Sequence, residues 1–309
     1  YRNFCTKLWN AARFCEMNEC RYDPAFDPTA CTQVRNRWIV GKTAEAARDA
    51  RAALQAYRFN DMAGALYQFT WGTFCDWHLE FAKPVFQGGD ESTKAETRAT
   101  TAWVLDQLLH LLHPIMPFIT EELWEQMFDS RDGMLIISPW PDLDESLIDA
   151  EAAVEMDWVV RLISQIRAVR SEMNVTPGAK VPLLLKDAST ATRARLDTHR
   201  GLIITLARLD SADVLDGDVP KGSVQDIIDE ASIVLPLAGI LDIAAEQARL
   251  EKEAARLEGE IAKHDKKLAN KGFTDKAPAD VVETERTRRA DEAAMLAKIK
   301  VAMERLKAL

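Results

Sequence analysis

The sequence predicts a mainly α-helical protein in three parts: a helical bundle over residues 1–145, a small α+β module over 146–240 and a C-terminal antiparallel coiled-coil hairpin over 241–309. Three observations predict this organisation. Long amphipathic segments joined by short loops are typical of a bundle. Short apolar runs around a helical segment indicate strands in the second part. A heptad repeat that is interrupted by Gly and Pro indicates two paired helices in the third.

The first part contains five segments with helical periodicity, which cover 3–18, 30–58, 60–83, 92–113 and 117–128. Asn60 is a plausible N-cap of the third segment, because its side chain can accept a hydrogen bond from the first turn. Gly88-Gly89 is expected to break the chain before the fourth segment. The run Ser138-Pro139-Trp140-Pro141 closes the bundle.

The second part begins with a long helix, predicted over 145–173, which ends at the Pro-Gly turn near 177. Two short strands are predicted at 181–185 and 231–236, with a helix near 189–207 between them. This mixture of strand and helix signals indicates a small α+β module.

The third part repeats apolar residues at heptad spacing, first along Leu250, Ala254, Leu257, Ile261, His264 and Leu268, and then along Leu296, Ile299, Met303 and Leu306. The loop between the two segments contains Gly272 and Pro278, which a continuous helix would not accommodate. Two helices joined by so short a loop must fold back on one another. The sequence therefore predicts an arm on the order of 40 Å long, at 1.5 Å per residue.

Net charge is −10, which taken alone argues against a nucleic-acid partner. The distribution changes that interpretation, because residues 1–60 carry a net charge of +4 and residues 61–145 carry −11. An acidic protein can still bind an anion locally, so phosphate contacts are expected near the start of the chain. The five cysteines lack C-x-x-C pairs, which favours reduced thiols over disulfides or a zinc ribbon. No apolar run is long enough to span a membrane.

Catalytic signatures are missing from the sequence. Gly41-Lys42-Thr43 resembles the end of a phosphate-binding loop, but Asn36 occupies the position where that loop requires glycine. Cys75 and His78 lie one helical turn apart and could be two metal ligands. Buried packing is the favoured role for both, because no further Cys or His lies near them in the sequence. We expect no catalytic residue and no metal site in this chain.

The first helix has a polar face that needs an explanation. Its core stripe is formed by Phe4, Leu8, Ala11, Ala12 and Cys15, while Asn3, Lys7, Asn10, Arg13, Phe14 and Met17 lie on the other side. Phe14 among polar residues is either covered by a neighbouring helix or free to stack on an unpaired base. Asn10 can bind a base edge, and Lys7 and Arg13 can hold phosphates.

Several segments resemble the valyl-tRNA synthetase family. They include Lys7-Leu8-Trp9-Asn10-Ala11-Ala12-Arg13-Phe14, Tyr57-Arg58-Phe59-Asn60, Phe74-Cys75-Asp76-Trp77-His78, the block from Leu112 to Trp124 with its His-Pro and Glu-Glu-Leu-Trp, and Asn270-Lys271-Gly272-Phe273. The block from 112 to 124 is shared with isoleucyl and leucyl enzymes, whereas the first helix together with the arm is specific to the valyl enzymes. His78 departs from the tyrosine expected in the family.

The resemblance implies a C-terminal fragment, and the start of the chain without an initiator Met or signal peptide agrees with that expectation. It implies that Lys7, Asn10, Arg13 and Phe14 read the valine anticodon. It also implies that the arm braces the tRNA elbow. The arm's contact residues are expected near its tip, at Lys266, Lys267, Lys271, Phe273 and Lys276.

The resemblance further implies partners and cofactors. The partners are tRNA(Val) and the catalytic and editing domains of the same polypeptide, and the protein is expected to be a cytoplasmic monomer. ATP and Mg²⁺ would bind the catalytic core, because its H-I-G-H and K-M-S-K-S motifs do not occur here. The fragment is therefore expected to be inactive alone. Two alternatives remain open: a scaffold protein whose coiled coil pairs in parallel, and an autonomous thiol or zinc enzyme.

Overall fold

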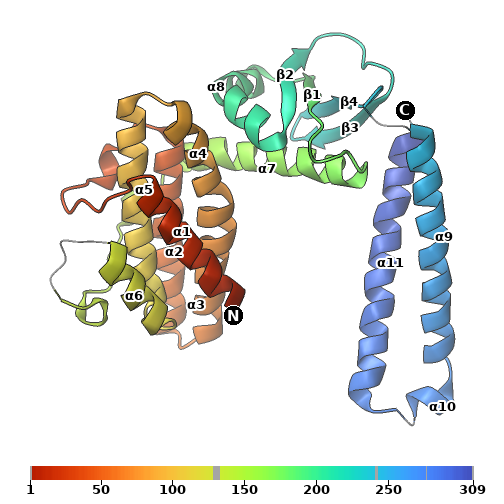
Figure 1. Cartoon of the computed structure of the whole chain (residues 1–309), viewed down its shortest axis with the longest axis horizontal. Helices are drawn as coiled ribbons and strands as arrows, with labels where there is room; N and C mark the ends of the chain where they lie inside the picture. The colour runs from red at the N-terminus through yellow and green to blue at the C-terminus, as the bar shows by residue number, and fades with distance from the viewer. Residues whose placement is uncertain (1, 128–132, 241–242, 276, 308–309) are drawn as a thin grey trace. The chain divides into compact units, whose positions relative to one another are not determined.

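The computed structural model describes residues 2–127, 133–240, 243–275 and 277–307. The chain divides into two compact units, residues 1–160 and 161–309. Helices dominate both, and strands occur only in the second unit among the described residues (Figure 1). The prediction of a mainly α-helical protein is confirmed. No helix among the described ranges is both long and apolar enough to cross a bilayer.

The first unit is a helical bundle. Its α-helices are α1 (Arg2–Met17), α2 (Val34–Gln55), α3 (Phe59–Gln68), α4 (Leu79–Gly88), α5 (Glu91–Leu112) and α6 (Pro117–Met127), with the start of α7 (Ala150–Glu172). Single 3₁₀ turns η1 (Pro28–Ala30), η3 (Leu135–Ile137) and η4 (Glu145–Leu147) interrupt the loops. The five predicted helical segments are all present. Asn60 is not an N-cap, because α3 begins one residue earlier and the Asn60 amide donates to Asp61 instead.

A π-helical stretch, η2 (Phe69–His78), lies between α3 and α4, so the chain is helical without a break from 59 to 88. The sequence pattern predicts the helix but not its wider turn. Thr70 lies at the start of the stretch and donates its hydroxyl to the Leu66 carbonyl at 2.6 Å. Such wide turns often occur at functional sites. Here the stretch carries Phe74, Cys75 and His78 into the core.

Helix α1 is followed by a left-handed residue, Glu19, with φ 58°. The Cys20 amide donates to the Cys15 carbonyl at 2.9 Å, and the Glu19 amide donates to Glu16 at 3.0 Å. These two bonds are the Schellman pattern, which satisfies carbonyls that a helix end otherwise leaves unpaired. Cys15 and Cys20 are both buried at this turn, so the thiols act as small apolar groups.

The second unit contains a four-stranded mixed sheet with the order β2-β1-β4-β3. The strands are β1 (Val181–Lys186), β2 (Leu209–Leu215), β3 (Ser223–Ile228) and β4 (Ala231–Pro236), and α8 (Thr190–Ala207) connects the parallel pair β1 and β2. The predicted strands are β1 and β4. The prediction missed β2 and β3, because Asp and Ser interrupt their apolar pattern while tertiary pairing determines the strands.

The C-terminal arm is a hairpin of α9 (Ile243–Leu268) and α11 (Ala279–Lys307), which pack against each other along their length. The seam buries the apolar side chains Leu250, Ala254, Leu257, Val282, Ala302 and Leu306. The predicted antiparallel hairpin is confirmed, and the scaffold alternative, which required a parallel zipper, is not supported. The loop is not wholly irregular, because α10 (Lys271–Thr274) forms one turn that Asn270 caps.

Candidate nucleic-acid interface

Helix α1 presents four predicted contact residues on one side. Asn10 and Arg13 are exposed, whereas Lys7 and Phe14 are half-buried. They share a face because steps of three and four residues return to the same side of a helix. Leu8 and Cys15 are buried on the opposite side and fix how the helix is rotated. The structure therefore brings the four residues together on a surface that a ligand can reach.

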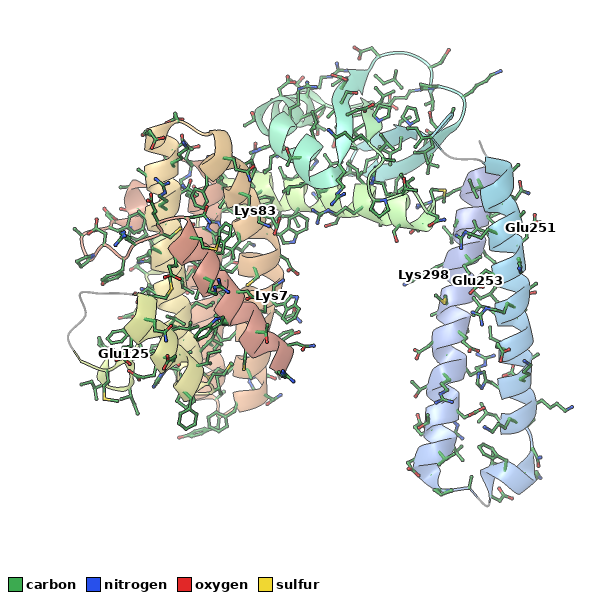
Figure 2. All side chains as sticks on the ribbon, in the orientation of Figure 1. Lys7, Lys83, Glu125, Glu251, Glu253 and Lys298 are labelled. Atoms are coloured by element: carbon green, nitrogen blue, oxygen red, sulfur yellow. The ribbon has the colours of Figure 1, made fainter. Side chains whose placement is uncertain are left out.

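Lys7 is not a free cation. Its ammonium Nζ lies 2.7 Å from Asp76 Oδ1 and 4.9 Å from the centre of the Trp71 ring. Both partners come from η2, so the π-helical stretch positions this side chain. Figure 2 shows Lys7 on α1. An ammonium that is already paired contributes less to a phosphate than a free one would. Arg13 is consequently the stronger candidate for a phosphate contact.

Phe14 is partly covered by a neighbouring helix. Its ring centre lies 6.1 Å from that of Phe86 in α4, and the Arg98 guanidinium lies 6.0 Å from the Phe86 ring. The Phe14 ring therefore takes part in packing, while part of its surface remains exposed. Both of the roles weighed from the sequence are compatible with this position. Phe86 and Arg98 were missed by sequence reasoning, because they lie on other helices far along the chain.

Met17 follows Arg13 by one helical turn on the same face and is 76% exposed. Helical spacing predicts its place on this face but indicates no role for it. A flexible thioether beside Phe14 extends the apolar part of the surface at the end of α1. The face thus combines an amide, a cation and two apolar side chains, a composition that suits an unstacked base flanked by a phosphate.

Cys75 and His78 lie in the core of the bundle. His78 Nε2 is 2.9 Å from the Thr101 hydroxyl, and burial lowers the pKa of His78 to about 3. Burial likewise raises the pKa of the Cys75 thiol to about 12. Packing is the role that their burial supports. Within the described ranges, no group of three or more possible ligands could hold a metal ion.

The tip of the arm presents basic side chains around one aromatic ring. Lys266 and Lys271 are exposed, and Lys267 lies with its Nζ 4.9 Å from the centre of the Phe273 ring. Phe273 is half-buried against this lysine and lies within α10. The predicted contact Lys276 lies outside the described residues.

Below the tip, the seam of the arm becomes polar. His264 Nδ1 is 2.8 Å from Glu285 Oε1, and Lys267 Nζ is 2.9 Å from Glu285 Oε2. These hydrogen bonds lower the pKa of Glu285, with the bond from Lys267 as the largest cause. The heptad pattern places His264 in the seam but does not identify its partners. A charged layer of this kind fixes the register of the two helices.

Comparisons with known proteins match two parts of the chain, most of the bundle and the arm. The family model described as "Anticodon-binding domain of tRNA ligase" matches residues 36–185, and the one described as "Valyl tRNA synthetase tRNA binding arm" matches residues 242–307. The α1 face precedes the first matched range, while the tip of the arm lies within the second.

Similarity to known proteins extends over nearly the whole chain. A valine–tRNA ligase of Caulobacter vibrioides is 49% identical over 99% of this chain and 34% of its own length. Corresponding ligases of Agrobacterium fabrum and Mesorhizobium japonicum are each 47% identical over 99% of this chain. The chain spans about a third of the length of these curated relatives, at 32% and 33% for the latter two.

Proposed function

Because this chain belongs to the valyl-tRNA synthetase family and carries its anticodon-binding domain and tRNA-binding arm, we propose that it recognises tRNA(Val) for a synthetase. The bundle reads the valine anticodon through the α1 face, and the arm braces the tRNA elbow. Valine is attached by domains of the same polypeptide that lie outside these 309 residues.

The observation that carries the proposal is the accessible α1 face. Asn10 and Arg13 are exposed there beside the half-buried ring of Phe14. An amide reads base edges, a guanidinium binds phosphate or stacks on a base, and an aromatic ring stacks on an unpaired base. Anticodon loops present all three of these targets. Lys7 has the lesser role of orienting this face through Asp76.

The arm supplies a contact that does not depend on the nucleotide sequence of the tRNA. Lys266 and Lys271 are exposed near a ring that Lys267 covers. Ammonium groups bind phosphates without reading bases, so this contact positions the tRNA. Lys276 is included in this phosphate contact on the basis of the sequence alone.

Catalysis is assigned to the rest of the polypeptide. The two ATP-binding motifs of the family are absent from this sequence, so ATP and Mg²⁺ are expected to bind elsewhere in the synthetase. We propose that the chain alone does not activate valine, acts as a monomer and works in the cytoplasm.

Nuclease footprinting of tRNA(Val) with the isolated chain tests the proposal. Protection is expected in two separate places, the anticodon loop and the corner where the D and T loops meet. The variant Asn10→Ala with Arg13→Ala should remove the first protection and leave the second. A footprint confined to the acceptor stem, or none at micromolar protein, would contradict the proposal.

A further inference from the structure

One end of the bundle exposes large apolar side chains that nothing in the proposed function uses. We define this apolar end by Leu54, Tyr57, Phe59, Ile115 and Phe118. Tyr57 is 82% exposed, Phe59 is 56% exposed and Phe118 is 90% exposed. Scattered exposed apolar residues are ordinary, but five gathered at the end of one bundle indicate an interaction surface.

The topology places these residues at the same end. Tyr57 lies in the short turn from α2 to α3, and Phe59 is the first residue of α3. Ile115 lies in the turn from α5 to α6, and Phe118 is the second residue of α6. The Asn36 side chain near the start of α2 donates a hydrogen bond to Thr97 in the first half of α5. The continuous helix 59–88 lies between these two helices in the sequence, and both run antiparallel to it. The two helices therefore run in the same direction, and their final turns lie at one end of the bundle (Figure 1).

The backbone at Tyr57 is held in an unfavourable conformation. Its φ is 56°, in the left-handed region that favours glycine at the position after a helix. The Arg58 amide donates to the Ala53 carbonyl at 2.8 Å, which completes the same Schellman turn that ends α1. Within this turn the Tyr57 ring meets Phe59 edge-on, with 6.4 Å between the ring centres. An exposed tyrosine in this strained conformation adds little to the stability of the fold, which suggests that Tyr57 has a role in binding.

The charges around the apolar end argue against RNA as its occupant. Arg58 is paired with Asp61 at 3.1 Å, and Arg51 is paired with Asp142 at 2.7 Å. Cations that are already compensated offer little to a phosphate backbone. Glu122 and Glu125 follow Phe118 on the exposed face of α6. Figure 2 labels Glu125 on this helix. A polyanion would be repelled there.

The same carboxylates argue against a second copy of the chain. A twofold dimer brings the same patch of two copies together, so the acidic rims would face each other. A partner with an apolar surface and basic side chains around it fits better. The relatives are about three times as long as this chain, so a polypeptide of that length contains further parts that can supply such a partner.

We propose that the apolar end is the docking surface for another domain of the same synthetase polypeptide. That domain presents an apolar patch rimmed by Lys or Arg, which complements Phe118 and the acidic side of α6. The proposal rests on family membership and not on tRNA binding, so the two can fail separately.

Hydroxyl-radical footprinting of the full-length synthetase polypeptide, compared with the isolated chain, tests the proposal. Oxidation of Tyr57, Phe59 and Phe118 should be several-fold slower in the full-length polypeptide without tRNA. Equal rates in the two proteins would overturn the proposal. Slowing that appears only when tRNA(Val) is added would assign the surface to RNA. Slowing in the isolated chain that grows with its concentration would assign it to self-association, and either result overturns the proposal.

Variants provide a second measurement. Tyr57→Ser with Phe118→Ser should lower the melting temperature of the full-length polypeptide but not of the isolated chain, because both side chains are exposed in the chain alone. Ile227→Ser is the matched control, since Ile227 is an exposed apolar residue of β3. Binding of tRNA by the isolated double variant should equal that of the parent chain. A double variant that melts like the control in the full-length polypeptide would overturn the proposal.

Discussion

His264 lies between two carboxylates of the opposing arm helix, with its Nδ1 2.8 Å from Glu285 Oε1. Its other ring nitrogen, Nε2, is 3.2 Å from Glu292 Oε2. A neutral imidazole has one donor, so only the protonated ring satisfies both carboxylates. The hydrogen bond with Glu285 is the largest cause of a raised His264 pKa. The register of the hairpin is thereby linked to protonation.

The arm should be most stable in mildly acidic solution. Because the His264 pKa is raised on folding, its contribution is complete below about pH 6.5 and is lost as pH rises through the raised value. The lowered pKa of Glu285 adds stability above about pH 4.3, which is lost as pH falls through the lowered value. Thermal melts that follow the helicity of the arm should show this pH dependence. In His264→Gln, the loss of stability between neutral and alkaline pH should be smaller. A melt of the parent chain that is unchanged between pH 6 and 9 would contradict this linkage.

The bundle should respond to acid in the opposite direction. The His78 pKa is lowered to about 3 by burial, so the unfolded chain takes up a proton below about pH 6.5 that the folded bundle excludes. Lowering the pH from 7.5 to 5.5 should therefore cost the bundle about 1 kcal/mol through this residue. Urea unfolding at the two pH values measures the loss. His78→Gln, which cannot titrate, should reduce it, and an equal loss in the variant would exclude His78 as the cause.

The fold was largely predictable because its main signals are local. Heptad spacing from Leu250 to Leu268 and the break at Gly272 and Pro278 are sufficient for the hairpin. Helical periodicity does not distinguish the wide turns of η2, and the Thr101 hydroxyl that meets His78 comes from another helix, α5. Strand β2 carries Asp210, Ser211 and Asp213, and its pairing with β1 comes from a crossover that no local pattern encodes.

Phe14 should affect both binding and stability, because its ring is shared between the surface and Phe86. Phe14→Ala removes both contributions and cannot separate them. Phe14→Leu keeps apolar packing, so it should change the free energy of unfolding by less than about 1.5 kcal/mol. It should weaken tRNA(Val) binding by about 1–3 kcal/mol if the ring stacks on a base. Parent-like affinity in the Leu variant would leave packing as the only role of the ring.

The arm tip should act through charge alone. Lys271→Ala is expected to reduce the slope of log affinity against log salt by about 1 and to weaken all tRNAs alike. Lys298→Ala is the matched control, because Lys298 is an exposed lysine of α11 that Figure 2 shows away from the tip. Salt titrations of binding measure both slopes. Equal slopes for the two variants would remove Lys271 from the contact.

The candidate site was predictable only in part. Helical spacing is enough to group Asn10, Arg13 and Phe14, because they come from one helix. The partners that modify them come from other helices: Asp76 and Trp71 engage Lys7, and Phe86 covers part of Phe14. Separations of 60 or more residues along the chain leave no trace in a local pattern, so Lys7 looked more available than it is.

We propose above all that the α1 face reads the anticodon. The most direct measurement is the affinity of the isolated chain for tRNA(Val) and for the same tRNA with only its anticodon replaced. The tRNA with the valine anticodon should bind more tightly than the other. This difference in affinity should narrow in Asn10→Ala and should stay as in the parent chain in Lys271→Ala. Equal affinity of the parent chain for the two tRNAs would contradict the claim.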